Sequence, residues 1–243
     1  MTLLDIDRIR AGFPGRPIDY HQSIDSTMLA AAGRPLGTVV LAGAQTAGQG
    51  RHGHSWHSEA GGGLYCSLVL EPAQVLTLAL GLATQTAILE ATGIACDLRW
   101  PNDVMLGGKK LAGILVQLVD GKAIAGIGIN LNQTAFPAGL AADATSLKLH
   151  DAGTDGTFPD ATGILIALLR AVDSFTKEDQ DSILRLFTHA SSYAAGRRVT
   201  VHQPGGVITG TTAGLDPSGF LIVRKDDGTD TLILAGGVRA AGS

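Results

Sequence analysis

The stretch TAGQGRHGHSW, which begins at residue 46, concentrates residue types that bind anions. Gly48, Gly50 and a third glycine three residues later have the spacing G-x-G-x-x-G of a dinucleotide-binding loop. That motif needs a helix directly after its last glycine, because the first N–H groups of the helix bind the pyrophosphate. The residues that follow, HSWHSEAGGG, have no helical periodicity, which argues against this interpretation. We expect instead a glycine-rich binding loop with one permanent cation, Arg51, and one large aromatic side chain, Trp56.

Three histidines in the same loop, His52, His54 and His57, raise the question of a zinc site. Zinc ligands occur at short and familiar spacings, usually with cysteines or carboxylates. Neither residue type stands beside these histidines at such a spacing. We therefore interpret them as polar residues of a flexible loop.

The stretch RWPNDVMLGGKKLAGILVQ, which begins at residue 99, contains a second group of reactive residue types. Asn102 and Asp103 are short polar residues that can brace a turn. Lys109 and Lys110 open a strand whose remaining residues, 111–119, are almost all apolar. Because side chains alternate between the two faces of a strand, one of these lysines shares the covered face. A buried ammonium group needs an anionic partner or a ligand, whereas a lysine at a strand end also reaches water; both interpretations stay open.

The elements that must hold these groups follow from the periodicity of the apolar residues. A helix is expected for residues 75–93, where the spacing is helical and Gly93 supplies a C-terminal cap. Three antiparallel strands are expected for residues 104–132, because Gly107-Gly108 and Asp120-Gly121 suit two-residue hairpin turns. Buried strands are expected at 36–45 and 63–72, and amphipathic helices at 160–177 and 180–189. The pattern predicts an α/β (α+β) protein with a central mixed or antiparallel sheet and flanking helices.

The pattern changes after Tyr193. Four short strand-like runs follow, GRRVTVHQ, VITGTTAGLD, GFLIVRKDDG and DTLILAGGVR, with turn residues between them. Short strands at this spacing are typical of a small β-barrel. We therefore predict two domains, residues 1–194 and 195–243.

Composition narrows the class of protein further. The 243 residues are 45% apolar, which is enough for a sizeable core, and the net charge of −4 offers no basic surface for nucleic acid. The N-terminal residues MTLLDIDRIR have scattered charges where a signal peptide is apolar, and Cys66 and Cys96 are the two cysteines. No apolar run approaches the ~18 residues of a membrane span. We expect a cytoplasmic protein that binds neither DNA nor a membrane.

Five motifs together resemble, in their order and spacing, those of the biotin protein ligases. They are IDST (24–27), QTAGQGRHGHSW (45–56), RWPND (99–103), GKKLAGILVQ (108–117) and GIGINLN (126–132). The resemblance implies a class II synthetase-like catalytic domain followed by a small SH3-like β-barrel. Fewer than twenty residues precede DYHQSIDST, too few for the winged helix-turn-helix of the repressor members. We therefore expect the monofunctional type.

The resemblance also implies the reaction. A biotin protein ligase joins biotin to ATP as biotinyl-5′-AMP and then transfers biotin to a lysine of the biotin carboxyl carrier domain of an acyl-CoA or pyruvate carboxylase. Both reactants of the first step are anions, so fixed cations and Mg²⁺ bound with ATP are needed to offset their repulsion. No metal site formed by the protein alone is expected.

The roles of single residues follow from the same resemblance. The residues implied to bind biotin are Ser26, Thr27, Gln45, Gly48, Gln49, Gly50, Arg51, Lys110 and Gly113. Those implied to bind ATP are Arg51, Trp56, Asn102, Lys110 and Asn130. Those implied in catalysis are Arg51, Lys110 and Asp103, the last of which would help the incoming lysine to lose its proton.

Three departures from the family pattern affect the site. Met28 stands where the family usually has asparagine, and Gln49, His52 and His54 stand where many members have arginine. Arg99 occupies a usual lysine position, and the two residue types differ in geometry.

Two other functions remain open. The same core fold serves lipoate ligases and octanoyl transferases, although the GQGRHGHSW loop favours biotin. A non-catalytic biotin-binding regulator of transcription would need a DNA-binding module, which the short N-terminus and the net charge argue against.

Overall fold

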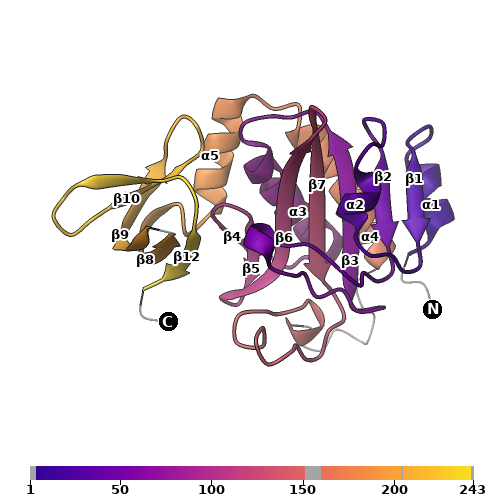
Figure 1. The fold of residues 1–243 in the computed structure, drawn as a ribbon, viewed down its shortest axis with the longest axis horizontal. Coiled ribbons are helices and arrows are strands. Elements are labelled where there is room, and N and C mark those ends of the chain that lie inside the picture. Colours follow the sequence, from indigo (N-terminus) through magenta and orange to yellow (C-terminus); the bar gives the residue numbers. More distant parts are fainter. Residues whose placement is uncertain (1–3, 151–159, 204, 242–243) are drawn as a thin grey trace.

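The computed structural model describes residues 4–150, 160–203 and 205–241. The described strands form two sheets, which lie next to each other along the long axis of the molecule (Figure 1). The second sheet begins at Ala195, where we predict the second domain to begin. The domain boundary itself remains a prediction.

The larger unit contains the elements before residue 191. In chain order they are α1 (Ile6–Gly12), β1 (Ile18–His21), α2 (Thr27–Ala31), β2 (Val39–Ala42), the 3₁₀ turn η1 (Arg51–Gly53), β3 (Gly63–Leu70), α3 (Leu76–Thr92), β4 (Asp97–Arg99), β5 (Asp103–Leu106), β6 (Lys109–Val119), β7 (Lys122–Asn130), η2 (Lys148–His150), α4 (Ala161–Phe175) and α5 (Gln180–Ala190). None of the described helices is long and apolar enough to cross a membrane.

The larger sheet is mixed, with the strand order β1-β2-β3-β7-β6-β5-β4. Strands β1 and β2 pair in parallel, and the remaining described neighbours pair in the antiparallel sense. Helices α3 and α4 pack together over one face, while α2 and the loop between β2 and β3 lie over the other (Figure 1). This arrangement confirms the predicted fold class.

Cover on both faces explains the apolar sequence of the central strands. All residues of β3 except the last are buried, and most of β7 is buried too. A strand that is buried on both sides has no solvated face and therefore loses the alternation of polar and apolar residues. Helix α3 is likewise buried around most of its circumference, and it ends at Gly93 in the left-handed conformation, as predicted.

Both predicted hairpin turns form. Gly107 and Gly108 join β5 to β6 with φ of 59° and 78°, and Asp120 and Gly121 join β6 to β7 with φ of 49° and 74°. Positive φ at both central positions is the type I′ geometry, whose twist matches the flanking strands. The turns fix a register in which Gly113 of β6 lies opposite Gly128 of β7.

Four short elements of this unit were not predicted from the sequence, although Asp5 caps the start of one of them, α1. These are α1, β1, α2 and β4, with lengths of 7, 4, 5 and 3 residues. Periodicity needs a window longer than these elements, so their positions come from tertiary contacts.

The C-terminal strands differ in two respects from the prediction. They are β8 (Ala195–Gln203), β9 (Gly206–Leu215), β10 (Leu221–Arg224), β11 (Asp230–Ile233) and β12 (Gly237–Ala240). The last expected run divides into β11 and β12, because Gly236 interrupts it with a φ of 141°. The described strands have the antiparallel order β11-β10-β9-β8-β12, so β11 and β12 are opposite edges and no pairing between them closes a barrel.

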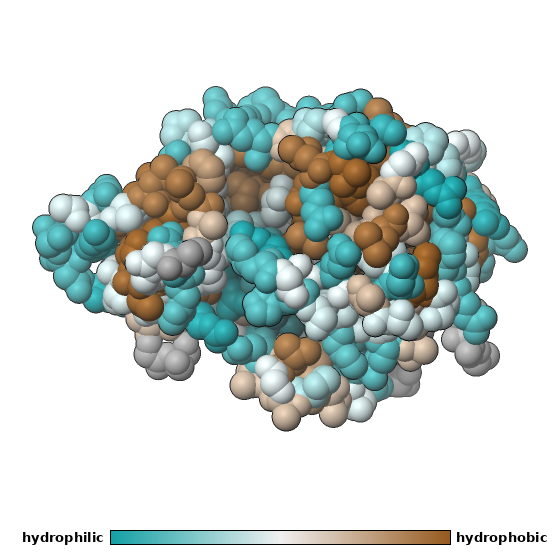
Figure 2. Space-filling view, in the orientation of Figure 1, coloured by the Kyte–Doolittle hydropathy of each residue, from teal (hydrophilic) through white to brown (hydrophobic). Residues whose placement is uncertain are grey.

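The two units contact each other directly. The buried Trp100, between β4 and β5, donates from Nε1 to the carbonyl oxygen of Gly219 at 2.9 Å. Arg239 of β12 pairs with Asp143 of the larger unit at 3.1 Å. The surface is hollowed between the C-terminal sheet and the larger unit, as the space-filling view shows (Figure 2).

Candidate active site

Two adjoining cavities bring the predicted site residues together. The inner pocket, of about 40 Å³, lies on the face of the larger sheet that α2 and the loop between β2 and β3 cover. The outer cleft, of about 760 Å³, lies between that sheet and the C-terminal sheet. The predicted residues that line the inner pocket are Thr27, Gln45, Gln49, Gly50, Arg51, Trp56, Asn102, Lys110 and Gly113. Asp103 and Asn130 line the outer cleft, which shares Gly50, Arg51, Trp56, Asn102 and Lys110 with the pocket.

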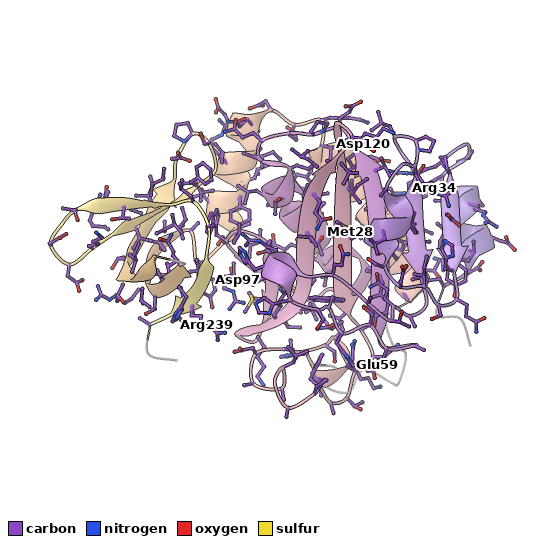
Figure 3. All side chains as sticks on the ribbon, viewed as in Figure 1. Met28, Arg34, Glu59, Asp97, Asp120 and Arg239 are labelled. Carbon is purple, nitrogen blue, oxygen red and sulfur yellow. The ribbon has the colours of Figure 1, made fainter. Side chains whose placement is uncertain are left out.

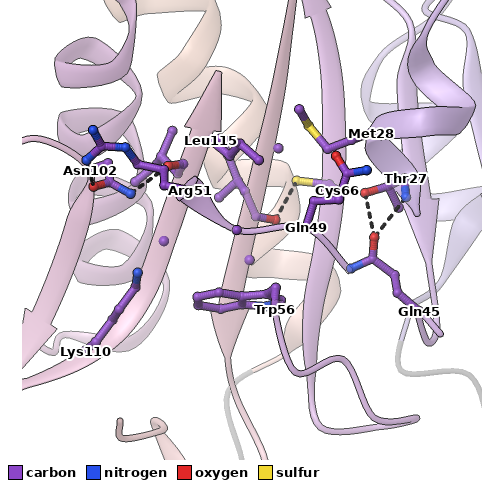
Figure 4. Close-up of a pocket in the computed structure, with 16 residues that line it drawn as sticks. Thr27, Met28, Gln45, Gln49, Arg51, Trp56, Cys66, Asn102, Lys110 and Leu115 are labelled. Carbon is purple, nitrogen blue, oxygen red and sulfur yellow. Dashed lines mark hydrogen bonds between the residues drawn. The ribbon is translucent and has the colours of Figure 1, made fainter. Parts of the chain in front are cut away.

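The floor of the inner pocket consists of glycines on neighbouring strands. A Cβ atom on Gly113 of β6 would lie 2.8 Å from the Trp56 ring, and one on Gly128 of β7 would lie 2.3 Å from its Nε1. The indole therefore rests on bare backbone, between Lys110 and Gln45 in the close-up (Figure 4). Its Nε1 is buried without a hydrogen-bond partner among the described residues. A larger residue at either position would displace the ring.

One end of the pocket is a fixed hydrogen-bond network. The Oε1 atom of Gln45 accepts from the Thr27 backbone N–H at 2.8 Å and from its hydroxyl at 3.1 Å. The Gln45 amide donates to Ser58 Oγ at 2.8 Å, and Ser67 Oγ donates to Thr27 Oγ1 at 2.8 Å. Each group is held by at least one other, so this end presents donors and acceptors in a defined geometry.

The other end carries excess positive charge. Lys110 Nζ lies 2.6 Å from Asp103 Oδ1, and Arg99 binds the second carboxylate oxygen at 2.7 Å. Arg51 donates to Asn102 Oδ1 at 3.0 Å, and Asn102 in turn donates to the Ile114 carbonyl. Three cations thus surround one carboxylate, which leaves charge available for a bound anion.

This arrangement shifts the pKa values of Asp103 and Arg51. Burial opposes a charge on Asp103, but Lys110 and Arg99 outweigh it and hold the pKa of the carboxyl below its usual value. Burial lowers the pKa of Arg51, an effect that Asp103 partly offsets. Arg51 nevertheless remains charged at neutral pH, because a guanidinium group stays protonated in proteins.

The loop between β2 and β3 folds as a hairpin over the pocket. Gly50 N–H donates to the His54 carbonyl at 2.7 Å, and Trp56 N–H donates to the Gly48 carbonyl at 2.8 Å. His52 turns the tip with a φ of 56°. A Cβ on Gly48 would lie 2.6 Å from the Trp56 carbonyl oxygen, so glycine is needed where the two sides of the hairpin meet.

Ser26, Gly48 and Asn130 are predicted site residues that do not line the inner pocket. Ser26 is fully buried at the start of α2 and Gly48 is buried in the loop. The Asn130 side chain donates to the Thr145 carbonyl at 2.9 Å, so its amide holds the segment that forms one wall of the cleft. Among the described residues no cluster of three or more histidines, cysteines or carboxylates is arranged to hold a metal ion.

Sequence reasoning missed part of the site. Gly126 and Gly128 alternate on β7 and so share one face, a signal that a period of two could have revealed. The wall of the cleft formed by Asp143 and Ala144 pairs with the backbone of Lys110, whose N–H donates to the Asp143 carbonyl at 2.7 Å. Arg239 reaches the cleft from the far end of the chain, and neither its sequence context nor that of Asp143 indicates the contact.

Comparison with known proteins relates both units to characterised families. Residues 20–133 match the sequence model of the biotin/lipoate A/B protein ligase family, and residues 195–238 match that of the biotin protein ligase C-terminal domain. The bifunctional ligase/repressor BirA of Bacillus subtilis is 34% identical, over 88% of this chain and 71% of that protein. The biotin–[acetyl-CoA-carboxylase] ligase of Mycobacterium tuberculosis is 32% identical, over 94% of this chain and 90% of that protein.

A solved structure agrees with these sequence matches. The biotin protein ligase from Aquifex aeolicus in complex with biotin and ATP is 31% identical and superposes with a TM-score of 0.82, over 93% of this chain and all of that chain. The order of the motifs, the two-sheet fold and these matches lead to the same assignment: this chain belongs to the biotin protein ligase family.

Proposed function

We propose that this chain is an ATP-dependent biotin ligase that acts on the biotin carboxyl carrier domain of an acyl-CoA or pyruvate carboxylase. One observation carries the proposal. A single pocket has a fixed hydrogen-bond network at Thr27 and Gln45 and excess positive charge at Arg51 and Lys110, and it opens into a cleft. Biotin has matching ends, a ureido group that donates and accepts hydrogen bonds and a carboxylate. The cleft has room for the nucleotide.

In the first step an oxygen of the biotin carboxylate attacks the α-phosphorus of ATP. The bond between that phosphorus and the bridging oxygen breaks, and pyrophosphate leaves with the electron pair. Lys110 and Arg51 reduce the repulsion between the two anions and stabilise the charge that develops on the phosphate. Gly113 and Gly128 leave the space in which the Trp56 ring lies against the sheet, so the ring itself would border the tail of biotin.

In the second step the acceptor lysine, as a free amine, attacks the carbonyl carbon of biotinyl-5′-AMP. An amide bond forms, AMP leaves, and the nitrogen releases a proton. Asp103 faces this region, but its lowered pKa makes it a weak base. We therefore propose that Asp103 chiefly positions Lys110 and Arg99, and its suggested part in deprotonation remains a prediction.

Mg²⁺ would come to the site with ATP. Of the two carboxylates that line the described part of the cleft, Asp103 is engaged by Lys110 and Arg99, and Asp143 is 57% exposed at the rim. Asp143 is also paired, with Arg239, so the phosphates of ATP would be the main ligands of the ion. The ion would offset phosphate charge.

The test offers the protein a choice of substrates. Purified protein is mixed with MgATP, a biotin carboxyl carrier domain, biotin and lipoate, and the mass of the acceptor is measured. We expect a gain of one biotinyl group that disappears without ATP. A gain of one lipoyl group would instead indicate a lipoate ligase of the same fold. No gain in mass would contradict ligase activity.

We further propose a cytoplasmic protein for which DNA is not a main partner. The net charge of −4 supports this, because non-specific binding to DNA depends on a positive surface. A filter-binding assay with mixed duplex DNA at low salt checks it, and tight binding there would contradict the proposal.

A further inference from the structure

Met28 forms part of the wall of the inner pocket, next to Thr27 on α2 (Figures 3 and 4). Its side chain is only 5% exposed. The Sδ atom lies 2.6 Å from the point where a Cβ on Gly126 would stand, and Cγ lies 3.1 Å from it. The thioether of Met28 therefore fills the space that the absent side chain of Gly126 leaves open above β7.

The lining of the pocket around Met28 has a polar part, which includes Thr27 and Gln49, and an apolar part, which includes Leu115 and Cys66. Leu115 lines the same pocket and packs against the small hydrophobic cluster to which Met28 belongs. Cys66 also lines it, but its thiol donates to the Ile127 carbonyl at 3.7 Å, and burial raises its pKa to about 12, so it stays neutral. A thioether, a neutral thiol and an isobutyl group offer a ligand no strong hydrogen-bond partner.

This apolar wall matches one part of biotin. The proposed function places the ureido group at Thr27 and Gln45 and the carboxylate at Arg51 and Lys110. The parts of the molecule left over are the saturated ring with its single sulfur atom and the alkyl tail, both of which are nearly apolar. The ring is fused to the ureido group, whereas the tail leads away to the carboxylate; because Met28 is the neighbour of Thr27, the ring is the part that faces the wall formed by Met28 and Leu115.

We propose that Met28 determines specificity at the ring sulfur, so that the pocket accepts the thioether of biotin and rejects its oxidised forms. The proposal rests on the proposed function. A sulfone adds two oxygen atoms, each of which accepts hydrogen bonds from water. Burying them against Met28 removes that water without a replacement donor, which is costly.

The test compares the binding of biotin and biotin sulfone by calorimetry, without ATP. The proteins are the wild type, Met28→Ala and Leu29→Ala; Leu29 is the next residue of α2 and is 52% exposed, so it is a matched control for changes in the helix. We expect the wild type and Leu29→Ala to prefer biotin by about tenfold or more. Met28→Ala should reduce this preference at least fivefold, mainly by binding the sulfone better. An unchanged preference in Met28→Ala would overturn the proposal.

A second pair of variants tests the contact itself. Gly126→Ala places a methyl group against Sδ and should push Met28 into the pocket, which we expect to weaken biotin binding about tenfold. In the double variant Met28→Ala/Gly126→Ala the thioether is absent, so the new methyl group has room. This variant should recover most of the lost affinity for biotin. A double variant that binds biotin no better than Gly126→Ala would also contradict the proposal.

Transfer of biotin by the wild type to the carrier domain is measured in parallel. Its absence would contradict the proposed function. Normal transfer with an unchanged preference in Met28→Ala would contradict only the role of Met28.

Discussion

At the scale of single residues, the site depends on an imbalance of charge. Arg51, Arg99 and Lys110 lie around one ionised carboxylate, Asp103, in a partly buried setting. Pairing with Asp103 fixes the lysine without neutralising the whole cluster. The cluster can therefore be stable before substrates bind and still attract them.

Removing either cation that faces the pocket should slow adenylate formation. We expect Lys110→Ala and Arg51→Ala each to lower the rate of pyrophosphate release by about tenfold or more, since each removes a contact to transition-state charge. Lys109→Ala is the matched control, because Lys109 neighbours Lys110 on β6 but is exposed and bonds to Ala141 instead. Rates near the wild type in either pocket variant would show that the site is misassigned.

The ion pairs of Asp103 also predict how stability depends on pH. Its pKa in the folded protein lies below the ordinary value of about 3.9, so its stabilising effect is present above that value and is lost as pH falls through the folded pKa. Asp103→Asn should therefore lower the free energy of unfolding at pH 7, and the difference from the wild type should shrink below about pH 4. Urea titrations at several pH values measure this. The control is Asp7→Asn, at a side chain that is 98% exposed, and an equal effect of both substitutions would refute the assignment.

At the scale of elements, predictions from the sequence were most accurate where the structure depends only on neighbouring residues. The hairpin turns at Gly107-Gly108 and Asp120-Gly121 and the end of α3 at Gly93 depend only on neighbouring residues. Both helices after residue 159 were predicted to within a few residues. The short helix α2 was not predicted, because the hydrogen bond that its Thr27 N–H donates goes to Gln45, eighteen residues away in sequence.

The candidate site shows the same division. The motifs indicated Lys110, Arg51 and Gln45, which the structure places in one pocket. Contacts between distant parts of the chain, such as Asp143 with Arg239, leave no local pattern and could not be predicted. The closed barrel was inferred from strand spacing, which does not determine whether the first and last strands pair.

The turn at Asp120 provides a prediction at this scale. Asp120 lies at the tip of the β6–β7 hairpin with a φ of 49° (Figure 3). Aspartate tolerates this conformation better than residues with plain aliphatic side chains. We expect Asp120→Ala to lower the free energy of unfolding by about 1 kcal/mol, and Asp120→Gly to have a smaller effect or to stabilise. Urea denaturation compares them, and a loss in the glycine variant as large as in the alanine variant would contradict the backbone explanation.

At the scale of the whole molecule, the cleft joins both sheets. Arg239 of β12 pairs with Asp143, and the backbone of Asp143 pairs with Lys110. The C-terminal sheet is thus connected to the strand that carries the proposed catalytic lysine. Both side chains of the ion pair are half exposed, and such pairs contribute at most about 1 kcal/mol to stability.

Reversing the charge at the cleft should therefore affect the nucleotide more than the fold. We expect Arg239→Glu to raise the KM for ATP about fivefold or more through repulsion of the phosphates, with the KM for biotin little changed. Steady-state kinetics at low and high salt measure this, and the effect should shrink at high salt. Arg198→Glu is the control, since Arg198 lies on the neighbouring strand β8 but pairs with Asp226 instead. If both charge reversals raised the KM for ATP equally, Arg239 would have no specific role in binding the nucleotide.

The two tryptophans of the chain occupy the two locations that matter most for this architecture. Trp56 lies on the glycine floor of the inner pocket, and Trp100 is bonded to Gly219 where the sheets meet. The protein therefore carries its own pair of fluorescent reporters. In a Trp100→Phe protein, emission follows the arrival of a ligand at the pocket, and in a Trp56→Phe protein it follows the attachment of the C-terminal sheet. Stopped-flow traces of the two proteins would show whether the tryptophan at the contact between the sheets responds when a ligand fills the pocket.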